Sequence, residues 1–341
     1  MGKNVVISGY YGYGNFGDEA ILYTLIQKLN SYDADITVLS GNPDFTTLNY
    51  YVKSVKNFSL HKVIKAIKQS DILISGGGSL LQDATSLKSL LYYLSIIALG
   101  LCFRKKVIIF AQGIGPVNNR VAAMLTGFLL KRCEYVSVRD ENSLKLLETW
   151  NVHANLVCDP IYSFPFVKSE TTDTVGVQLR NFKSMNDRLL KKIALQLVKD
   201  FPDKKIEVIS LQDLIDLPVC NRFSEFLKNI KPDANVEVIS GLSGKYVVEK
   251  LSKLDYLIGM RFHALLLAMK FGVKSIAINY DIKVAKLAEE YNIPVISMDA
   301  DEDFDDVFMR MKALSSDDLR LIAEQKDFDW SGIDNIFKNI V

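Results

Sequence analysis

Cysteine, histidine and excess charge are all scarce in this chain of 341 residues. The three histidines have no other ligand-type side chains grouped around them, so we expect no metal and no cofactor. The 41 Lys and Arg against 40 Asp and Glu leave a net charge of +1, which lacks the basic footprint of a nucleic-acid-binding protein. The cysteines are too widely spaced for a disulfide framework or a zinc knuckle, and we expect them to be reduced: Cys102, Cys133, Cys158 and Cys220.

Long apolar runs are missing as well. The longest, Leu90 to Phe103, has 14 residues and falls short of the ~18 that a membrane-spanning helix needs. Arg104, Lys105 and Lys106 follow it, so two interpretations remain: a core helix, which runs of this length favour, or a helix in peripheral contact with a membrane surface. The first residues lack the pattern of a signal peptide, which predicts a cytoplasmic protein, with the inner face of the cell membrane as its place of contact.

Short β-branched runs alternate with helix-periodic segments along the whole chain, the pattern of βαβ units on parallel sheets. Residues 159–173 interrupt this alternation with prolines and polar residues, as a linker does. We therefore predict an α/β protein with two Rossmann-like domains facing each other across a cleft, as in the GT-B fold. Residues 1–165 form the first domain, residues 174–315 the second and residues 316–341 a helical tail. The predicted strands include Ile36–Leu39, Ile72–Ser75, Val107–Ala111, Tyr135–Val138, Val236–Ile239 and Tyr256–Gly259.

Glycine-rich loops follow two strands of the first domain. Residues 12–17 read Gly-Tyr-Gly-Asn-Phe-Gly, which matches a dinucleotide-binding pattern, but Asp18 and Glu19 in the next turn would oppose a pyrophosphate. A sugar-contacting loop is the better interpretation, and we assign acceptor binding to Tyr11, Tyr13 and Asn15. The second loop contains Gly76, Gly77 and Gly78, which would let a ligand approach the backbone closely.

Cationic side chains follow several strands at their carboxyl ends, where ligands bind in parallel sheets. Arg139 either forms a surface ion pair or binds an anion. In the second domain Arg180 ends one strand, Arg261 and His263 follow another, and Lys283 follows the next. A histidine beside an arginine at a strand end favours catalysis over a solvated surface role. We expect one cleft to hold Arg139, Arg261, Lys283 and His263, which predicts a polyanion site with one group that titrates near neutral pH.

Seven stretches in the same order resemble the polysaccharide pyruvyl transferase family, and most closely its CsaB branch. They are GYYGYGNFGDEAIL at Gly9–Leu22, ISGGGSLLQD at Ile74–Asp83, AQGIGPV at Ala111–Val117, SVRDENS at Ser137–Ser143, VGVQLRNF at Val175–Phe182, GMRFHALLLA at Gly259–Ala268 and NYDIKV at Asn279–Val284. Two stretches depart from the family pattern. Phe262 stands where the family usually has the leucine of Arg-Leu-His, and Ile282 stands where it usually has the proline of Asp-Pro-Lys.

The resemblance implies transfer of a pyruvyl group from phosphoenolpyruvate onto two hydroxyls of one sugar as a cyclic ketal. In the CsaB branch the acceptor is an N-acetylmannosamine of a lipid-linked saccharide, a cell-wall polymer precursor. The resemblance carries catalysis to His263 and Arg261, and donor binding to Arg139, Arg261 and Lys283. To the donor site we add Gly76, Gly77 and Gly78, and to the acceptor site Arg180. Taken as whole domains, we expect the first to form the acceptor side and the second the donor side.

Two other classes of protein fit the same architecture. A GT-B glycosyltransferase would use a nucleotide sugar in place of phosphoenolpyruvate, since a fold does not fix a function. A solute-binding protein would also have two α/β lobes but no need for a proton-transfer histidine. The sequence leaves open whether copies of the chain form a homo-oligomer.

Overall fold

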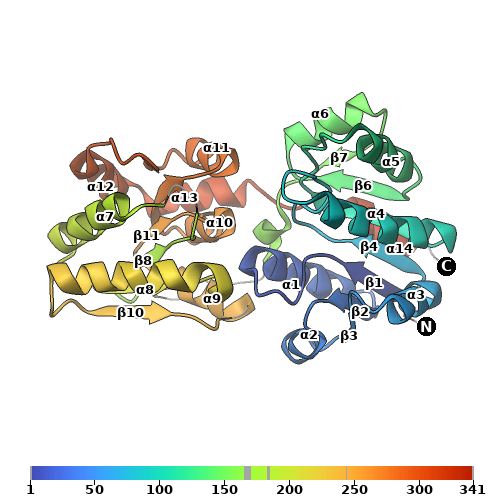
Figure 1. Cartoon of the computed structure of the whole chain (residues 1–341), viewed down its shortest axis with the longest axis horizontal. Helices are drawn as coiled ribbons and strands as arrows, with labels where there is room; N and C mark the ends of the chain where they lie inside the picture. Colours follow the sequence, from blue (N-terminus) through green and yellow to red (C-terminus); the bar gives the residue numbers. More distant parts are fainter. Residues whose placement is uncertain (1, 165–169, 183–184, 243, 340–341) are drawn as a thin grey trace. The chain divides into compact units, whose positions relative to one another are not determined.

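The computed structural model describes residues 2–164, 170–182, 185–242 and 244–339. Contacts between Cα atoms divide the chain into two units, each with its own parallel sheet (Figure 1). Unit 1 comprises Met1–Phe164 together with Asp327–Val341, and unit 2 comprises Pro165–Lys326. The α/β class with two Rossmann-like units is therefore confirmed. Part of the predicted linker, residues 165–169, lies outside the described residues.

Unit 1 alternates strands and helices from its first strand to its last. Its elements are β1 (Asn4–Ser8), α1 (Phe16–Asn30), β2 (Asp35–Ser40), α2 (Pro43–Tyr50), β3 (Lys53–Lys56), α3 (Leu60–Gln69), β4 (Ile72–Ser75), α4 (Leu87–Cys102), β5 (Lys106–Gln112), α5 (Arg120–Leu130), β6 (Tyr135–Val138), α6 (Glu141–Thr149), β7 (Asn155–Leu156), the 3₁₀ turn η1 (Pro160–Ser163) and, near the carboxyl terminus, α14 (Ser331–Lys338).

The sheet of unit 1 has the strand order β3-β2-β1-β4-β5-β6-β7, with every pair parallel. The central strands are covered on both faces, which is why β4 is an unbroken run of buried residues. The order reverses between β1 and β4, and the loops after these two strands are the glycine-rich ones. Ligands of open α/β sheets bind at such a switch point, so the topology brings both loops to one place.

The two faces of this sheet are covered by different parts of the chain. Helices α3, α4, α5 and α6 bury apolar side chains against one face, where α4 contributes Leu90, Tyr93, Leu94 and Ile97. The carboxyl-terminal segment of unit 1 packs against Phe110 of β5, whose ring centroid lies 5.3 Å from that of Phe328 and 5.6 Å from that of Trp330. Unit 1 therefore contains residues from both ends of the chain.

Unit 2 repeats the alternation. Its elements are β8 (Thr174–Gln178), α7 (Asp187–Asp200), β9 (Lys205–Ile209), α8 (Asp213–Ile230), β10 (Val236–Ile239), α9 (Gly244–Ser252), β11 (Tyr256–Gly259), α10 (Phe262–Lys270), β12 (Lys274–Asn279), α11 (Ile282–Glu290), β13 (Val295–Ser297), α12 (Phe304–Ala313) and α13 (Ser316–Glu324). The predicted tail is thus divided, since α13 belongs to unit 2 and the residues after Lys326 belong to unit 1.

The sheet of unit 2 has the order β10-β9-β8-β11-β12-β13 and is also parallel. Its switch point lies between β8 and β11. Arg180 comes two residues after the end of β8, and Arg261 two residues after the end of β11. A core of Val, Leu, Ile and Phe side chains from α7, α8 and α12 covers one face and holds these strand ends in place.

The apolar run Leu90 to Phe103 forms most of α4, and its inward side belongs to the core of unit 1. Of the bases that follow, Arg104 is exposed, and Lys106 lies 3.4 Å from Glu134. The core interpretation of this run therefore holds. In the described part of the chain, none of the helices has the length and apolar character needed to cross a membrane.

Candidate active site

The carboxyl edge of the unit 2 sheet gathers most of the predicted catalytic groups. Gln178 of β8 pairs in register with Gly259 of β11, which in turn pairs with Ala277 of β12. The residues that follow these three adjacent strands therefore emerge side by side: Arg180, Arg261 with His263, and Tyr280 with Lys283. The register of these parallel strands thus places the three groups of residues along one edge of the sheet.

Arg261 forms a buried ion pair that the sequence does not reveal. Its Nε and Nη2 donate to the two carboxylate oxygens of Asp216, each at 2.8 Å, and Nη2 also donates to Gln212 Oε1 at 3.0 Å. Asp216 is fully buried in the first turns of α8, and the Arg261 side chain is 11% exposed. This bidentate geometry fixes the guanidinium and neutralises much of its charge.

Gln178 holds the turn that carries Arg261. Its Oε1 accepts from the backbone N–H of Arg261 at 2.7 Å and from that of Met260 at 3.3 Å, while its Nε2 donates to the carbonyl of Leu179 at 2.8 Å. All of these groups are buried or half-buried. The last residue of β8 therefore determines how the chain leaves β11 and enters α10.

Arg180 is a half-buried cation with unused donor capacity. Its Nη1 donates to the hydroxyl of Tyr280 at 3.3 Å, and its guanidinium lies 5.6 Å from the centroid of that ring. Its Nε is buried and has no hydrogen-bond partner within the described residues. A buried donor without a partner costs stability, so this position is suited to an anionic ligand that accepts from it.

His263 and Lys283 both lie in first turns of helices at this edge. His263 is half-buried, and its ring meets that of Phe262 edge to face with 5.1 Å between centroids. Lys283 is exposed on α11. The N-cap of this helix is Asp281, and the Asp281 carboxylate accepts from the backbone N–H of Lys283 at 2.9 Å. Ile282 occupies the first helical position, where proline is common, so the departure from the family pattern leaves this turn capped.

Arg139 belongs to unit 1 and is also paired with a carboxylate. Its Nη1 lies 2.5 Å from Asp159 Oδ2, and its Nη2 donates to Ser79 Oγ at 3.4 Å. The side chains of Arg139 and Asp159 are 10% and 4% exposed. The sequence left an ion pair and anion binding open for Arg139; the structure contains the ion pair, and it is buried.

The glycines at 76–78 are required by packing within unit 1. A Cβ at Gly76 would lie 1.9 Å from the hydroxyl of Tyr11, and one at Gly77 would lie 2.7 Å from a methyl of Ile21. Gly78 has a φ of +105°, which favours glycine. Packing and backbone conformation thus explain why all three positions are glycine, with no need for a bound ligand.

The aromatic residues of the first glycine-rich loop have different exposures. Tyr11 is fully buried, and its hydroxyl has no hydrogen-bond partner among the described residues. Tyr10 and Tyr13 stack with 4.4 Å between ring centroids, and the Tyr13 hydroxyl accepts from Asn57 Nδ2 at 2.9 Å. Asn15 donates to Asp18 within the loop. The accessible part of this loop is thus the stacked pair together with Asn15.

A buried glutamate ties this loop to the rest of unit 1. Glu19 accepts from the backbone N–H of Gly12 at 2.7 Å and from the hydroxyl of Tyr50 at 2.6 Å. Burial raises the pKa of its carboxyl, and the two hydrogen bonds oppose that shift. Glu19 therefore fixes the shape of the loop.

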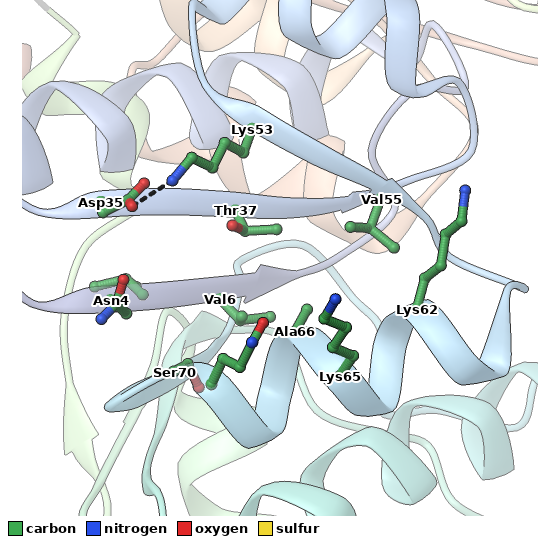
Figure 2. Close-up of a pocket in the computed structure, with 12 residues that line it drawn as sticks. Asn4, Val6, Asp35, Thr37, Lys53, Val55, Lys62, Lys65, Ala66 and Ser70 are labelled. Carbon is green, nitrogen blue, oxygen red and sulfur yellow. Dashed lines mark hydrogen bonds and ion pairs between the residues drawn. The ribbon is translucent and has the colours of Figure 1, made fainter.

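A cavity of about 410 Å³ opens at the opposite edge of the unit 1 sheet. Figure 2 shows it between α3 and strands β1 to β3, and its lining includes Asn4, Asp35 and Lys53, the first residues of those strands. None of the predicted site residues lines it. Nor do the described residues contain a group of three or more His, Cys, Asp or Glu side chains arranged to hold a metal ion.

The residues that sequence reasoning missed are the partners of the predicted ones: Gln178, Gln212, Asp216 and Tyr280. The one available signal was an acidic residue, Asp216, four positions before a buried cysteine in an otherwise apolar stretch of α8. A carboxylate placed where burial is expected indicates a partner of opposite charge.

Two Rossmann-like units, each with its own parallel sheet, are the architecture of the GT-B fold. UDP-GlcNAc 2-epimerase from Neisseria meningitidis, bound to UDP-GlcNAc, superposes with a TM-score of 0.62 at 11% identity and 94% coverage of both chains. A glycosyltransferase from Rickettsia africae superposes with a TM-score of 0.63 at 13% identity, covering 99% of this chain and 98% of its own. At these identities the likeness shows the fold alone.

The family is shown by the sequence. The model of the polysaccharide pyruvyl transferase family matches residues 15–282, and the chain belongs to that family. A similar protein is the amylovoran biosynthesis protein AmsJ of Erwinia amylovora. It is 21% identical over an alignment 371 positions long, which covers 86% of this chain and 88% of AmsJ. The protein is thus a pyruvyl transferase of polysaccharide biosynthesis.

Proposed function

We propose that the protein transfers the pyruvyl group of phosphoenolpyruvate onto a sugar hydroxyl pair as a cyclic ketal. The observation that carries the proposal is the cluster at the unit 2 edge, where Arg180, Arg261, His263 and Lys283 follow three adjacent strands. Phosphoenolpyruvate has a carboxylate and a phosphate, and guanidinium groups bind both through paired hydrogen bonds.

The geometry divides the cations by role. Asp216 accepts from Nε and Nη2 of Arg261, so we assign Arg261 to the border of the donor site, where its position is fixed. We assign to Arg180 and Lys283 the positive charge that binds the donor anion. The buried Nε of Arg180 would gain an acceptor from the donor anion, which favours this role over contact with a neutral sugar. The amino terminus of α10 adds partial positive charge at the same edge.

His263 is our candidate for proton transfer. In the proposed reaction C3 of phosphoenolpyruvate gains a proton, one sugar hydroxyl adds at C2, the C2–O bond to phosphate breaks, and the second hydroxyl adds at C2. The two hydroxyl protons end on C3 and on the released phosphate, so the balance needs no oxidant or reductant. An imidazole can carry a proton between these positions near neutral pH.

We place the acceptor at the unit 1 edge, against the stacked pair Tyr10 and Tyr13 with Asn15 beside them. Binding sites commonly combine aromatic faces with a few polar groups. The resemblance to the CsaB branch supports N-acetylmannosamine of a lipid-linked cell-wall polymer precursor as the acceptor. The buried Tyr11 would support this surface from below through its contact with Gly76.

Phosphate release is the direct test. With phosphoenolpyruvate and a water-soluble β-N-acetylmannosaminyl acceptor, His263→Ala should lower the rate about 10² to 10⁴-fold, the usual contribution of a positioned acid or base. His61→Ala, at an exposed position of α3, is the matched control and should keep the wild-type rate. Arg180→Ala should raise the KM for phosphoenolpyruvate more than it lowers kcat.

The rival activity is glycosyl transfer from a nucleotide sugar. A bound donor raises the melting temperature, so phosphoenolpyruvate should stabilise the protein and UDP-GlcNAc should not. Turnover of a nucleotide sugar, together with no phosphate release from phosphoenolpyruvate, would refute the proposal.

A further inference from the structure

Helix α5 has an apolar stripe on its outer side. Val121, Met124, Leu125 and Phe128 follow the i, i+3, i+4, i+7 spacing of one helix face, and three of them are largely exposed: Val121 at 69%, Met124 at 71% and Phe128 at 52%. The opposite side of the helix is buried in the core of unit 1. An apolar face on each side of a short helix indicates a second contact besides the core.

Helix α4 extends this apolar surface. It packs beside α5, and its Leu87 and Leu91, one turn apart, are exposed, whereas most of its other apolar side chains are buried or half-buried. We call Leu87, Leu91 and the four α5 residues the apolar stripe. Single exposed apolar residues are common, but a group on two neighbouring helices is typical of a contact surface.

Along the segment that carries the apolar stripe the charge has one sign, and a carboxylate lies at each end of the segment. Asp83 accepts from the backbone N–H groups of Asn118 and Asn119 at 2.7 Å, and Glu134 lies 3.4 Å from Lys106. Residues 84–133, which contain α4, β5 and α5, include no Asp or Glu, although the whole chain has 40. The same segment contains Lys and Arg at 88, 104, 105, 106, 120, 131 and 132. A chain with a net charge of +1 thus concentrates positive charge in the segment that carries its exposed apolar helix face.

The bases at the end of α5 lie directly on the apolar residues. The guanidinium of Arg132 covers the ring of Phe128, 3.6 Å from its centroid, and Lys131 beside it is exposed. Arg120 is exposed at the other end of the helix. Such side chains can place their stems on an apolar surface and their charges at its rim.

We propose that this surface docks on an anionic phospholipid bilayer, with α5 parallel to the membrane plane. The apolar stripe would enter the boundary between headgroups and acyl chains, and Arg120, Lys131 and Arg132 would contact lipid phosphates. A second copy of the chain fits less well, because a two-fold interface would bring two predominantly positive surfaces together, and the nearby carboxylate of Asp83 already accepts from the backbone N–H groups of Asn118 and Asn119. The inference does not depend on the proposed reaction, since none of these residues belongs to the candidate active site.

The structure also moves most of the membrane contact from the run first considered to α5. Leu90 to Phe103 contributes Leu91 to the apolar stripe and buries much of its remaining apolar side in the core, whereas Val121, Met124 and Phe128 of α5 reach solvent. The contact depends on individual exposed positions, which no hydropathy average over the sequence singles out.

Sedimentation with vesicles tests the charge of the surface. Wild-type protein should sediment with vesicles of equal parts phosphatidylglycerol and phosphatidylcholine at low salt, and should be released by high salt. Lys131→Gln/Arg132→Gln should weaken binding about 30-fold, since each base near an anionic surface contributes about a factor of five. Lys65→Gln/Lys68→Gln, exposed on α3, is the matched control and should bind like wild type.

A second pair of variants tests the apolar contact. Met124→Ser/Phe128→Ser should also weaken binding about 30-fold or more, whereas Leu195→Ser/Met309→Ser, at similarly exposed positions of α7 and α12, should not. Circular dichroism should show wild-type folding for all four variants. Each should release phosphate from phosphoenolpyruvate at the wild-type rate with the water-soluble acceptor, and His263→Ala should still bind vesicles.

Three results would overturn the inference. The first is failure of wild-type protein to sediment with anionic vesicles at low salt. The second is equal binding to vesicles of phosphatidylcholine alone, which would remove the role of charge. The third is a dimer in sedimentation velocity that Met124→Ser/Phe128→Ser converts to a monomer without changing vesicle binding, which would make the apolar stripe an interface between copies.

Discussion

Removing either member of the Arg261–Asp216 pair should destabilise unit 2 far more than removing both. In Asp216→Leu the nearly buried guanidinium of Arg261 would lose two hydrogen bonds of 2.8 Å together with the carboxylate charge that faces it. In Arg261→Met the fully buried carboxylate of Asp216 would lose its guanidinium partner and keep a hydrogen bond of 3.4 Å from the backbone N–H of Leu211. Breaking such a pair costs about 3–5 kcal/mol, whereas replacing both members by apolar residues is often neutral or stabilising.

The double variant Asp216→Leu/Arg261→Met should therefore be more stable than either single variant. Because the double variant should cost little, the coupling energy of the cycle should approach the sum of the two single costs, about 6 kcal/mol or more. Phosphate release should fall in all three variants, because each alters the fixed position of residue 261.

Thiol labelling can measure this cost in unit 2 alone. Cys220 is the one cysteine in residues 165–326; it is fully buried, and burial raises the pKa of its thiol to about 12. Its labelling therefore reports opening of the structure, and each single variant should label about 10² to 5 × 10³ times faster than wild type. Both tryptophans, Trp150 and Trp330, lie in unit 1, so their fluorescence is the control for the other unit. If both single variants cost less than about 1 kcal/mol and their effects add, the pair is not the buried unit described here.

Three further substitutions test other parts of the structure. Gly76→Ala should destabilise unit 1, because its Cβ would lie 1.9 Å from the Tyr11 hydroxyl. Tyr11→Phe removes that hydroxyl, so it should raise the free energy of unfolding by about 1 kcal/mol by itself and restore much of the stability lost in Gly76→Ala. Urea titration of the two single variants and the double variant measures both effects. Ile282→Pro should raise the free energy of unfolding by about 0.4–1 kcal/mol, because this position begins α11 and Asp281 before it is extended; a lower melting temperature would contradict this. Glu19 has a raised pKa when folded and so holds its proton at a pH where the unfolded chain has lost it. The free energy of unfolding should therefore fall as the pH rises from about 4.3 through the raised value, and Glu19→Gln should flatten that part of the profile.

Strands buried on both faces were predictable because their sequences are continuous apolar runs. Ile72–Ser75, Tyr135–Val138 and Tyr256–Gly259 have the predicted bounds. The edge strand β3 was not predicted, since Lys-Ser-Val-Lys is short and charged and half of it faces solvent. Its place in the sheet is fixed by pairing with β2, a contact that its own composition does not reveal.

The candidate site shows the same limit. Parallel strands bring their carboxyl ends together, so the sequence could place Arg180, Arg261 and Lys283 at one edge. It could not show that Asp216, 45 positions before Arg261, occupies the fork of that arginine. Nor could it show that the three glycines accommodate side chains of the protein, because a glycine run looks the same whether a ligand or a neighbouring tyrosine needs the space.

The return of the carboxyl-terminal segment to unit 1 has a consequence for biosynthesis. Phe328 and Trp330 pack on Phe110, and Phe337 stacks on Tyr32 with 4.4 Å between ring centroids. During translation the ribosome therefore makes the rest of unit 1 and then all of unit 2 before the last residues of unit 1 emerge. At a synthesis rate of about 5–20 residues per second, part of the first sheet stays uncovered for roughly 10 s or more, a period in which a chaperone could bind it.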